Sequence, residues 1–375
     1  MKILFTVEFY EPRKGGAEEV VKQLAERLVS FGHSVTVATT FIPDRSAGLL
    51  HGVTIESFHI SGNIVRGIQG SASEIARYRS FLLQSWDVVI NYAAQIWTTD
   101  LTFEVLGKIH GRKILVPCGY SGLYDPSYGQ YFMELPAHLR EYDTLVYMSE
   151  QYQDKLFGDQ HGVGNKAMYI PNGAAEEEFL ATDAFNFRKR FGIKTKHLVI
   201  TVSNHYRAKG HAFSIEAMKV ANRKDVSLAI IGEIPGKGGV LHAAHVIRGC
   251  YKNCFFASLM EKNIRVIAGK NREMVVSAYK ESDAFLFGSE IECAPLVMYE
   301  SFAAKTLFVT RDVGNVKDHK EYIKIVSTPV DMATTMSYYL DHPKERKEIT
   351  DIAFEAWRRD YTWHAIAKKY EKLFA

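Results

Sequence analysis

Two glutamates in the last third of the chain have a spacing that suggests chemistry. Glu292 and Glu300 flank Pro295, and they follow an apolar run, Ala284–Phe287, that predicts a buried strand. Because proline suits the first position of a helix, we expect Glu292 in a loop and Glu300 more than one turn inside the helix. The free amides of a first helical turn attract phosphate. A phosphate-binding helix end between two carboxylates, which can hold sugar hydroxyls, predicts a nucleotide-sugar site.

A second loop carries positive charge to an equivalent position. The polar segment Ser203–His211 follows the apolar run Leu198–Val202, and it contains Lys209 and Arg207. A diphosphate leaving group gains negative charge in the transition state, and a positioned cation stabilises that charge. A solvated basic loop is the alternative interpretation, because charged side chains are mostly exposed.

A third loop, Glu11–Glu18, joins the first expected strand to the first expected helix and contains Gly15 and Gly16. Glycines allow close approach of a phosphate to the backbone, and helix amides can receive it. The pair differs from the spaced three-glycine dinucleotide fingerprint, and no acid for a ribose follows the next strand, Ser34–Ala38, so a nicotinamide cofactor is disfavoured. A plain turn that needs two glycines remains the alternative.

The elements that must position these loops alternate between strand-like and helical patterns. The alternation runs to the turn Pro171–Gly173, pauses over the polar stretch Glu176–Lys196, and begins again at Leu198. It predicts parallel sheets covered by helices on both faces. Two such α/β halves in tandem predict a cleft between them, and ligands bind outside the carboxyl ends of the strands in such sheets.

Composition limits the class of protein. The chain has 375 residues, enough for two domains, with 47% hydrophobic and 24% charged residues, which is typical of globular proteins. A net charge of +3 does not indicate nucleic-acid binding. No apolar run approaches the ~18 residues of a membrane span, so we expect a cytoplasmic protein that associates at most peripherally with a membrane. Four cysteines form no secreted disulfide framework.

Three residue groups have open interpretations. Cys250 and Cys254, with His242 and His245, could bind zinc, although the spacing is not that of a standard finger and ordinary packing is favoured. An aromatic group could stack on a sugar or pack on the sheet, and it comprises Tyr120, Tyr124, Tyr128, Tyr131 and Phe132. A basic group could face a membrane or solvent, and it comprises Arg66, Arg77 and Arg79.

Taken together, the motifs resemble those of family 4 retaining glycosyltransferases (glycosyl transferases group 1), which have the GT-B fold of two Rossmann-like doubly wound domains facing a cleft. The resemblance spans nearly the whole chain and rests on Gly15-Gly16-Ala-Glu18, Tyr169–Gly173, Lys209-Gly210, Glu292-x7-Glu300 and Val313–Val316. It implies an acceptor-side domain over about residues 1–175 and a nucleotide-sugar domain over about 190–358. A helix over about 360–375 would pack back on the first domain.

The resemblance also implies roles. Glu292 would face the transferred sugar, Lys209 would hold the diphosphate, with Arg207 beside it, and Glu300 would accept the ribose hydroxyls. The other implied donor-side residues are Gly15, Gly16, Asn204, Ala268, Ala294, Pro295, Leu296 and Val297. Transfer would proceed by front-face substitution. The chain has no Asp-x-Asp pair, so we expect no cofactor and no divalent metal in catalysis.

Two positions depart from the family pattern. The usual arginine before the lysine is replaced by Ser203-Asn204, and Arg207 or His205 would have to supply its charge. The usual histidine of the acceptor-side loop is replaced by Cys118, followed by Gly119 and Tyr120.

We therefore predict a retaining glycosyltransferase that moves a sugar from a nucleoside-diphosphate sugar to a saccharide or lipid-linked saccharide acceptor, in cell-surface polysaccharide or glycolipid synthesis. The alternatives are a catalytically impaired donor-binding or scaffold subunit of the same fold, and a nucleotide-sugar epimerase.

Overall fold

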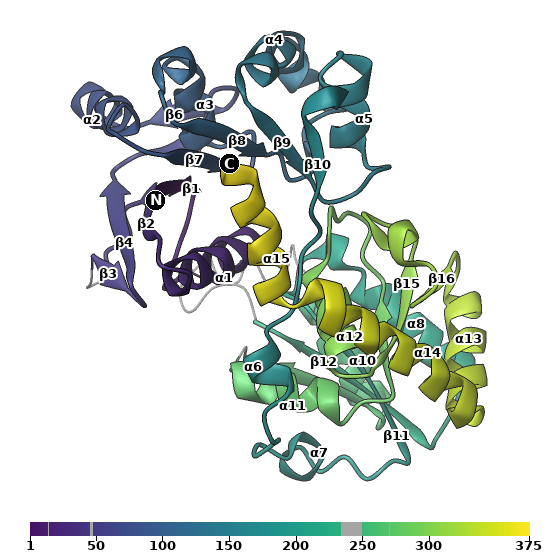
Figure 1. Ribbon diagram of the computed structural model, residues 1–375. Coiled ribbons are helices and arrows are strands. Elements are labelled where there is room, and N and C mark those ends of the chain that lie inside the picture. The colour runs from purple at the N-terminus through teal and green to yellow at the C-terminus, as the bar shows by residue number, and fades with distance from the viewer. Residues whose placement is uncertain (14, 46–47, 234–249, 270) are drawn as a thin grey trace. The chain divides into compact units, whose positions relative to one another are not determined.

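The computed structural model of the protein describes residues 1–13, 15–45, 48–233, 250–269 and 271–375. The chain divides into two compact units (Figure 1): unit 1 comprises residues 1–172 and 363–375, and unit 2 comprises residues 173–362. Each unit contains a large parallel sheet, as the alternating sequence pattern predicts.

The sheet of unit 1 has the order β10-β9-β8-β7-β1-β2-β4-β3. Its strands are β1 (Lys2–Thr6), β2 (Ser34–Thr40), β3 (Leu49–Leu50), β4 (Val53–Phe58), β7 (Val88–Tyr92), β8 (Arg112–Val116), β9 (Thr144–Tyr147) and β10 (Ala167–Tyr169). All neighbours are parallel except the edge pair β3 and β4. The central strand β7 is buried along its whole length, because helices cover both faces. The strand order reverses between β1 and β7, which makes the carboxyl ends of these two strands the expected binding position.

The helices of unit 1 are α1 (Gly16–Ser30), α2 (Ala72–Leu82), α3 (Trp97–Phe103), α4 (Gly129–Glu141), α5 (Gln153–Gln160) and α15 (Trp363–Glu371). The last of these comes from the far end of the chain and lies beside α1, as the yellow and purple ribbons of Figure 1 show. The Phe31 and His364 rings meet edge to face at 5.2 Å, and His33 Nε2 lies 2.9 Å from Glu371 Oε1. These contacts attach the carboxyl terminus to unit 1.

The sheet of unit 2 has the order β13-β12-β11-β14-β15-β16, and all its strands are parallel. They are β11 (His197–Val202), β12 (Val226–Gly232), β13 (Ile264–Ala268), β14 (Ala284–Phe287), β15 (Leu307–Arg311) and β16 (Lys324–Val326). Numbered within the unit, this order is 3-2-1-4-5-6, the doubly wound order of dinucleotide-binding folds. The predicted Rossmann-like architecture is therefore confirmed, and the order reverses between β11 and β14.

The helices of unit 2 are α6 (Glu176–Phe179), α7 (Phe187–Arg190), α8 (His211–Ala221), α10 (Tyr251–Met260), α11 (Arg272–Lys280), α12 (Leu296–Ala303), α13 (Pro329–Asp341) and α14 (Pro343–Ala356). Two apolar clusters cover the two faces of the sheet. After α14 the chain forms a π-helical turn at Trp357–Tyr361 and an extended Thr362, and it leaves unit 2 there.

Candidate functional site

The two loops at the reversal point of unit 2 touch through their glycines. Gly210 has φ of +64°, and a Cβ atom there would lie 1.8 Å from the carbonyl oxygen of Gly288, so only glycine fits. The amide of Glu290 donates to the carbonyl of Ala208 at 2.8 Å. The loop after β11, which carries Lys209, is therefore fixed against the loop after β14, which carries Glu292.

Lys209 and Glu292 form an ion pair, with Nζ and Oε1 2.7 Å apart. The Ser289 hydroxyl donates to the same carboxylate oxygen at 2.8 Å. The Lys209 side chain is 33% exposed and that of Glu292 is 14% exposed, so both can still be reached by a ligand. Gly314, with φ of +61°, packs so closely beneath this loop that a Cβ atom would lie 2.5 Å from the Cys293 carbonyl oxygen. A cation and an anion are thus held rigidly at the edge of the sheet.

Helix α12 begins beside this pair. Pro295 precedes the helix and does not form its first residue as we expected, because its ψ of 121° is extended. The first-turn amides, of Leu296 and Val297, have no partner inside the helix and remain able to bind an anion. Ala294, whose side chain is half-buried, comes directly before Pro295.

Glu300, in the second turn of α12, accepts a hydrogen bond from Arg272 Nη1 at 2.6 Å. The same guanidinium binds Glu178, with Nε 2.8 Å from Oε2. Arg272 opens α11 just after the carboxyl end of β13, where Ala268 is exposed. Ala268, an expected donor-side residue, and Glu300, expected to hold the ribose, therefore lie at the same edge of the sheet, and the sequence did not single out Glu178 as a member of this group.

The two other basic-loop candidates are placed differently. Arg207 is exposed and has no ion pair or side-chain hydrogen bond to the described residues. Asn204 is half-buried beside Gly232, where a Cβ atom would lie 3.4 Å from the Asn204 Cα. The Arg207 charge remains available to an anion, whereas Lys209 already has a partner.

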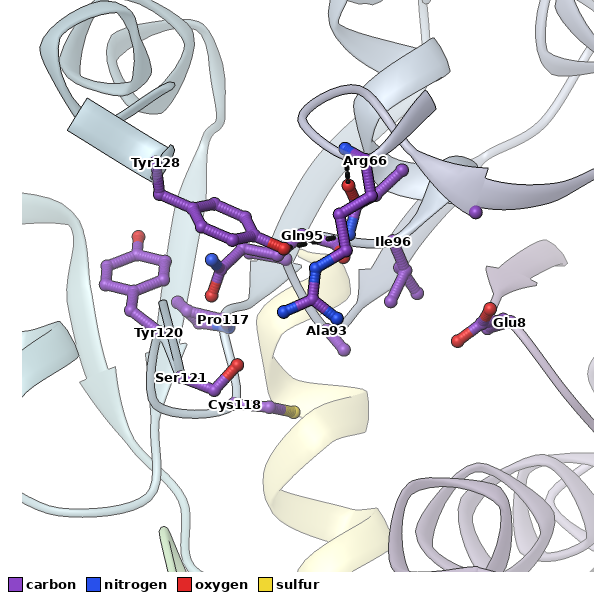
Figure 2. Close-up of a pocket in the computed structure, with 13 residues that line it drawn as sticks. Glu8, Arg66, Ala93, Gln95, Ile96, Pro117, Cys118, Tyr120, Ser121 and Tyr128 are labelled. Atoms are coloured by element: carbon purple, nitrogen blue, oxygen red, sulfur yellow. Dashed lines mark hydrogen bonds between the residues drawn. The ribbon is translucent and has the colours of Figure 1, made fainter. Parts of the chain in front are cut away.

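Unit 1 contains a cavity of about 440 Å³ at its own reversal point (Figure 2). Glu8 after β1, Gln95 after β7 and the Cys118 loop after β8 supply its walls, which also include Tyr120 and Ser121. A hairpin of β5 (Ser61–Asn63) and β6 (Gly67–Gln69), which the sequence did not predict, adds Asn63 and Arg66. The position of Glu8 directly after the first strand was the one available sequence signal for this polar lining.

The backbone around this cavity is strained. Ala93, Gln95, Cys118 and Tyr120 all have left-handed φ angles, of 73°, 62°, 60° and 48°, respectively. Such conformations cost on the order of 1 kcal/mol each for non-glycine residues, persist only where their surroundings fix them, and cluster at functional sites. Asp154 supplies one constraint, because its carboxylate accepts the Gly119 amide at 2.8 Å.

Burial perturbs the acids and the thiol of this region. It raises the pKa of Asp154 and of Asp100 to about 6, although the hydrogen bonds that each carboxylate accepts lower the pKa. It raises the pKa of Cys118 to about 12, so the thiol is neutral at physiological pH. A neutral thiol is a weak hydrogen-bond donor and acceptor, so Cys118 supplies less polarity to the cavity than an imidazole would.

The glycine pair lies near the same strand ends. Gly15 is the N-cap of α1, and a Cβ atom there would lie 2.2 Å from Glu18 Oε2, so the Glu18 side chain lies over it. Apart from its chain neighbours and the backbone of its own helix, no atom of the described residues lies within 4 Å of a Cβ position on Gly16, which therefore faces open space. Of the two glycines, Gly16 is the one that leaves room for a ligand.

The structure gives the members of the aromatic group and of the basic group different environments. Tyr120, Tyr128, Tyr131 and Phe132 are buried in the core of unit 1, whereas Tyr124 is 82% exposed. In the basic group, Arg77 pairs with Glu56 and Glu74, Arg79 pairs with Glu104, and Arg66 lines the cavity. The three arginines therefore do not form one free basic patch.

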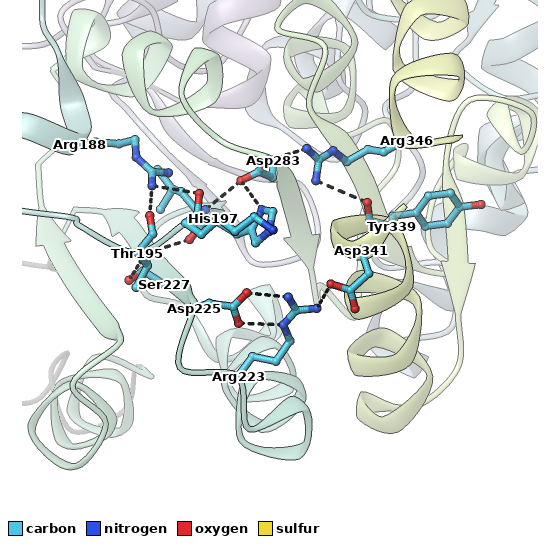
Figure 3. Close-up of polar contacts among 12 residues, drawn as sticks. Arg188, Thr195, His197, Arg223, Asp225, Ser227, Asp283, Tyr339, Asp341 and Arg346 are labelled. Atoms are coloured by element: carbon cyan, nitrogen blue, oxygen red, sulfur yellow. Dashed lines mark hydrogen bonds and ion pairs between the residues drawn. The ribbon is translucent and has the colours of Figure 1, made fainter. Parts of the chain in front are cut away.

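A further polar network lies at the amino ends of the unit 2 strands (Figure 3). Arg223 binds Asp225 at 2.7 Å and Asp341 at 2.8 Å, which joins the start of β12 to the end of α13. Asp283 accepts the Leu198 amide at 3.0 Å and binds Arg346 at 2.7 Å. Because these pairs occupy the edge opposite the Lys209 loop, we assign them to stability.

The structure places two histidines beside the cysteine pair that the sequence did not predict as zinc ligands. His242 and His245 lie outside the described residues. Cys250 and Cys254 instead meet two other histidines, His205 and His211, whose side chains are fully buried.

Comparison with known proteins identifies the fold. Residues 183–355 match the family model of glycosyl transferases group 1. The phosphatidylinositol N-acetylglucosaminyltransferase GPI3 subunit of Saccharomyces cerevisiae is 18% identical over 387 aligned positions, which cover 99% of this chain and 82% of the yeast protein.

Solved structures agree over the whole chain. Sucrose-phosphate synthase of Thermosynechococcus elongatus superposes with a TM-score of 0.77 at 14% identity, covering 100% of this chain and 98% of that one. Anabaena HepE in complex with UDP and glucose superposes with a TM-score of 0.75 at 15% identity, covering 99% and 98%. These likenesses establish the GT-B fold class. Among the described residues, no helix combines the length and the apolar character needed to cross a membrane.

Proposed function

We propose that this protein transfers a sugar from a nucleoside-diphosphate sugar to an acceptor hydroxyl, with retention of configuration, because residues 183–355 match the family model of glycosyl transferases group 1. The observation that carries the proposal is the Lys209–Glu292 pair beside the first turn of α12. A cation, free amides and a carboxylate at one sheet edge match a diphosphate bonded to a sugar.

In this proposal, different residues of unit 2 bind different parts of the donor. Lys209 and the amides of Leu296 and Val297 balance the charge that builds on the leaving diphosphate. Glu292 accepts hydroxyls of the sugar, and Glu300 accepts those of the ribose. The lysine and the amides supply the positive charge that a divalent metal supplies in other transferases, so we propose that transfer is metal-independent. UDP is the first nucleotide to test, because Anabaena HepE binds it.

The cavity of unit 1 is the proposed acceptor site. Glu8, Asn63, Arg66, Gln95 and Ser121 give it a mostly polar lining. Hydrogen-bonding side chains suit a saccharide or the sugar-like headgroup of a lipid better than an acyl chain. The similar yeast subunit is named for transfer to phosphatidylinositol. We therefore propose a role in cell-surface polysaccharide or glycolipid synthesis, on the cytoplasmic face of a membrane.

The test has a binding step and a turnover step. Calorimetric titration with UDP, GDP and ADP should show one preferred nucleotide, and Lys209→Met should weaken its binding. Incubation with a panel of UDP-sugars should release UDP slowly by transfer to water. Proton NMR of the first sugar formed should show the anomer present in the donor. Binding of no nucleotide would refute the donor site, and the opposite anomer would refute retention.

The same experiment separates the two alternatives. A scaffold subunit would bind the nucleotide without releasing UDP, with or without added saccharide acceptors. A nucleotide-sugar epimerase would produce an epimer of the donor, which NMR detects directly.

A further inference from the structure

Four side chains of unit 2 gather their ligand-type atoms at one point. His205 and His211 come from the loop and helix start after β11, and Cys250 and Cys254 come from the start of α10. The two imidazoles and the Cys254 side chain are fully buried, and Cys250 is 6% exposed. One nitrogen of each histidine and the sulfur of each cysteine all lie within 4.8 Å of one another.

The separations match the edges of a coordination tetrahedron. Cys250 Sγ lies 3.8 Å from His205 Nδ1 and 3.2 Å from His211 Nδ1, and Cys254 Sγ lies 3.6 Å from His211 Nδ1. With a Zn–S distance of about 2.3 Å and a Zn–N distance of about 2.0–2.1 Å, tetrahedral geometry separates sulfur from nitrogen ligands by about 3.6 Å. The three sulfur–nitrogen edges scatter around that value.

We propose that His205, His211, Cys250 and Cys254 bind a zinc ion. Two thiolates and two imidazoles are a donor set that selects zinc over magnesium or calcium, which prefer oxygen. Four protein ligands in a buried position leave no open coordination site for a substrate or water. The zinc is therefore structural, and it is separate from the sugar-transfer chemistry proposed above.

The surroundings support a ligand role for His211. Its Nε2 atom lies 2.7 Å from the Ser203 hydroxyl, so the ring is held while Nδ1 faces the cysteines. Metal-binding histidines are oriented by a partner on the second ring nitrogen in this way. For His205, Nδ1 also faces Cys250, while Nε2 is buried without a hydrogen-bond partner among the described residues.

The site would tie two distant segments together beside Lys209. His205 and His211 bracket Lys209 in the sequence, and both cysteines lie about forty residues further along the chain. A zinc ion bound at this position would anchor the lysine loop to α10. Zinc removal should therefore weaken nucleotide binding as well as lower stability. That consequence depends on the proposed function, whereas the presence of the metal does not.

The decisive measurement is metal content. The full chain, purified under reducing conditions without chelators, should contain about one zinc per molecule by mass spectrometry, and Cys254→Ser and His211→Gln should each lose most of it. Cys118→Ser is the matched control, because it removes a thiol outside the cluster and should retain the metal. If a variant fails to fold, metal removal from the wild-type chain and reconstitution with Co²⁺ should give the intense visible bands of tetrahedral thiolate coordination.

Three results would overturn the proposal. One is a chain that stays free of zinc after incubation with Zn²⁺ and gives no such Co²⁺ spectrum. The second is a disulfide between Cys250 and Cys254 in the native chain. The third is the brown absorbance of an iron–sulfur cluster, which would assign these ligands to iron. Zinc without any nucleotide binding would support the metal site and refute the proposed function.

Discussion

Asp154 should make the stability of unit 1 depend on pH in a direction opposite to that of an ordinary surface carboxylate. Its side chain is buried, and burial raises its pKa from 3.8 to about 6. The unfolded chain therefore releases this proton at a lower pH than the folded chain. The stabilising contribution is complete below about pH 3.8 and is lost as the pH rises through about 6.

The magnitude follows from the size of the pKa shift. A rise of about 2 units in pKa corresponds to about 2.7 kcal/mol, at 1.36 kcal/mol for each unit, and about 2.4 kcal/mol of stability is lost between pH 4 and pH 7. Asp154→Asn cannot ionise and should remove this pH dependence. Its absolute stability is a poor readout, because the two carboxylate oxygens accept the Gly119 and Lys155 amides and an asparagine offers only one acceptor. The slope of stability against pH is the informative quantity.

Urea denaturation of the wild type and of Asp154→Asn across about pH 4 to pH 7 tests this reasoning, with hydrogen exchange in β8 and β9 to report unit 1 alone. The difference in unfolding free energy between the two proteins should change by roughly 2.4 kcal/mol over that range. Asp125→Asn is the control, because the Ser127 side chain and amide lower the pKa of this exposed carboxylate, so its pH-dependent contribution lies below about pH 4 and its substitution should leave the slope over this range nearly unchanged. An unchanged slope in Asp154→Asn would show that the pKa of Asp154 is not raised in the folded chain.

Three further predictions concern unit 2. Glu292→Gln should bind UDP about five-fold more tightly, because Glu292 would no longer compete with UDP for Lys209 in a partly exposed ion pair worth about 1 kcal/mol. The same variant should not transfer sugar. Weaker UDP binding would show that Glu292 does not compete with UDP for Lys209. Gly210→Ala should destabilise far more than Gly192→Ala, because both have left-handed φ angles costing about 1 kcal/mol but only Gly210 meets a carbonyl oxygen; equal thermal shifts would disprove the contact. Arg223→Ala should cost about 1 kcal/mol of stability and leave the Kd for UDP unchanged, and a changed Kd would link this network to the site.

The sequence predicted the architecture well because the pattern is local. Buried parallel strands are continuous apolar runs, and β7, β11 and β14 all show them. The loop after each strand could then be placed at the carboxyl edge without knowledge of the strand order. For that reason Lys209 and Glu292 could be assigned to one site before any contact between them was known.

Side-chain partners could not be predicted in the same way, because they depend on contacts between distant segments. The sequence gives Lys209 and Glu292 separate roles, and only the structure shows that they neutralise each other at 2.7 Å. Nothing local in the sequence indicated that Arg272 binds Glu178 and Glu300. The cavity of unit 1 depends on a short hairpin whose strands are too brief to give a clear periodic pattern.

The cysteine pair shows the same limit and also suggests why the lysine loop departs from the family pattern. Proximity in the chain favoured His242 and His245 as partners, whereas the sheet order brings the loop after β11 to the start of α10. That loop is the one in which Asn204 stands where an arginine is usual, and His205 follows directly. A guanidinium would be a second fixed cation beside the diphosphate. Here the neighbouring side chain turns inward to the buried cluster, so the loop gains an internal anchor, and Lys209 with the exposed Arg207 must carry the positive charge of this loop toward a donor.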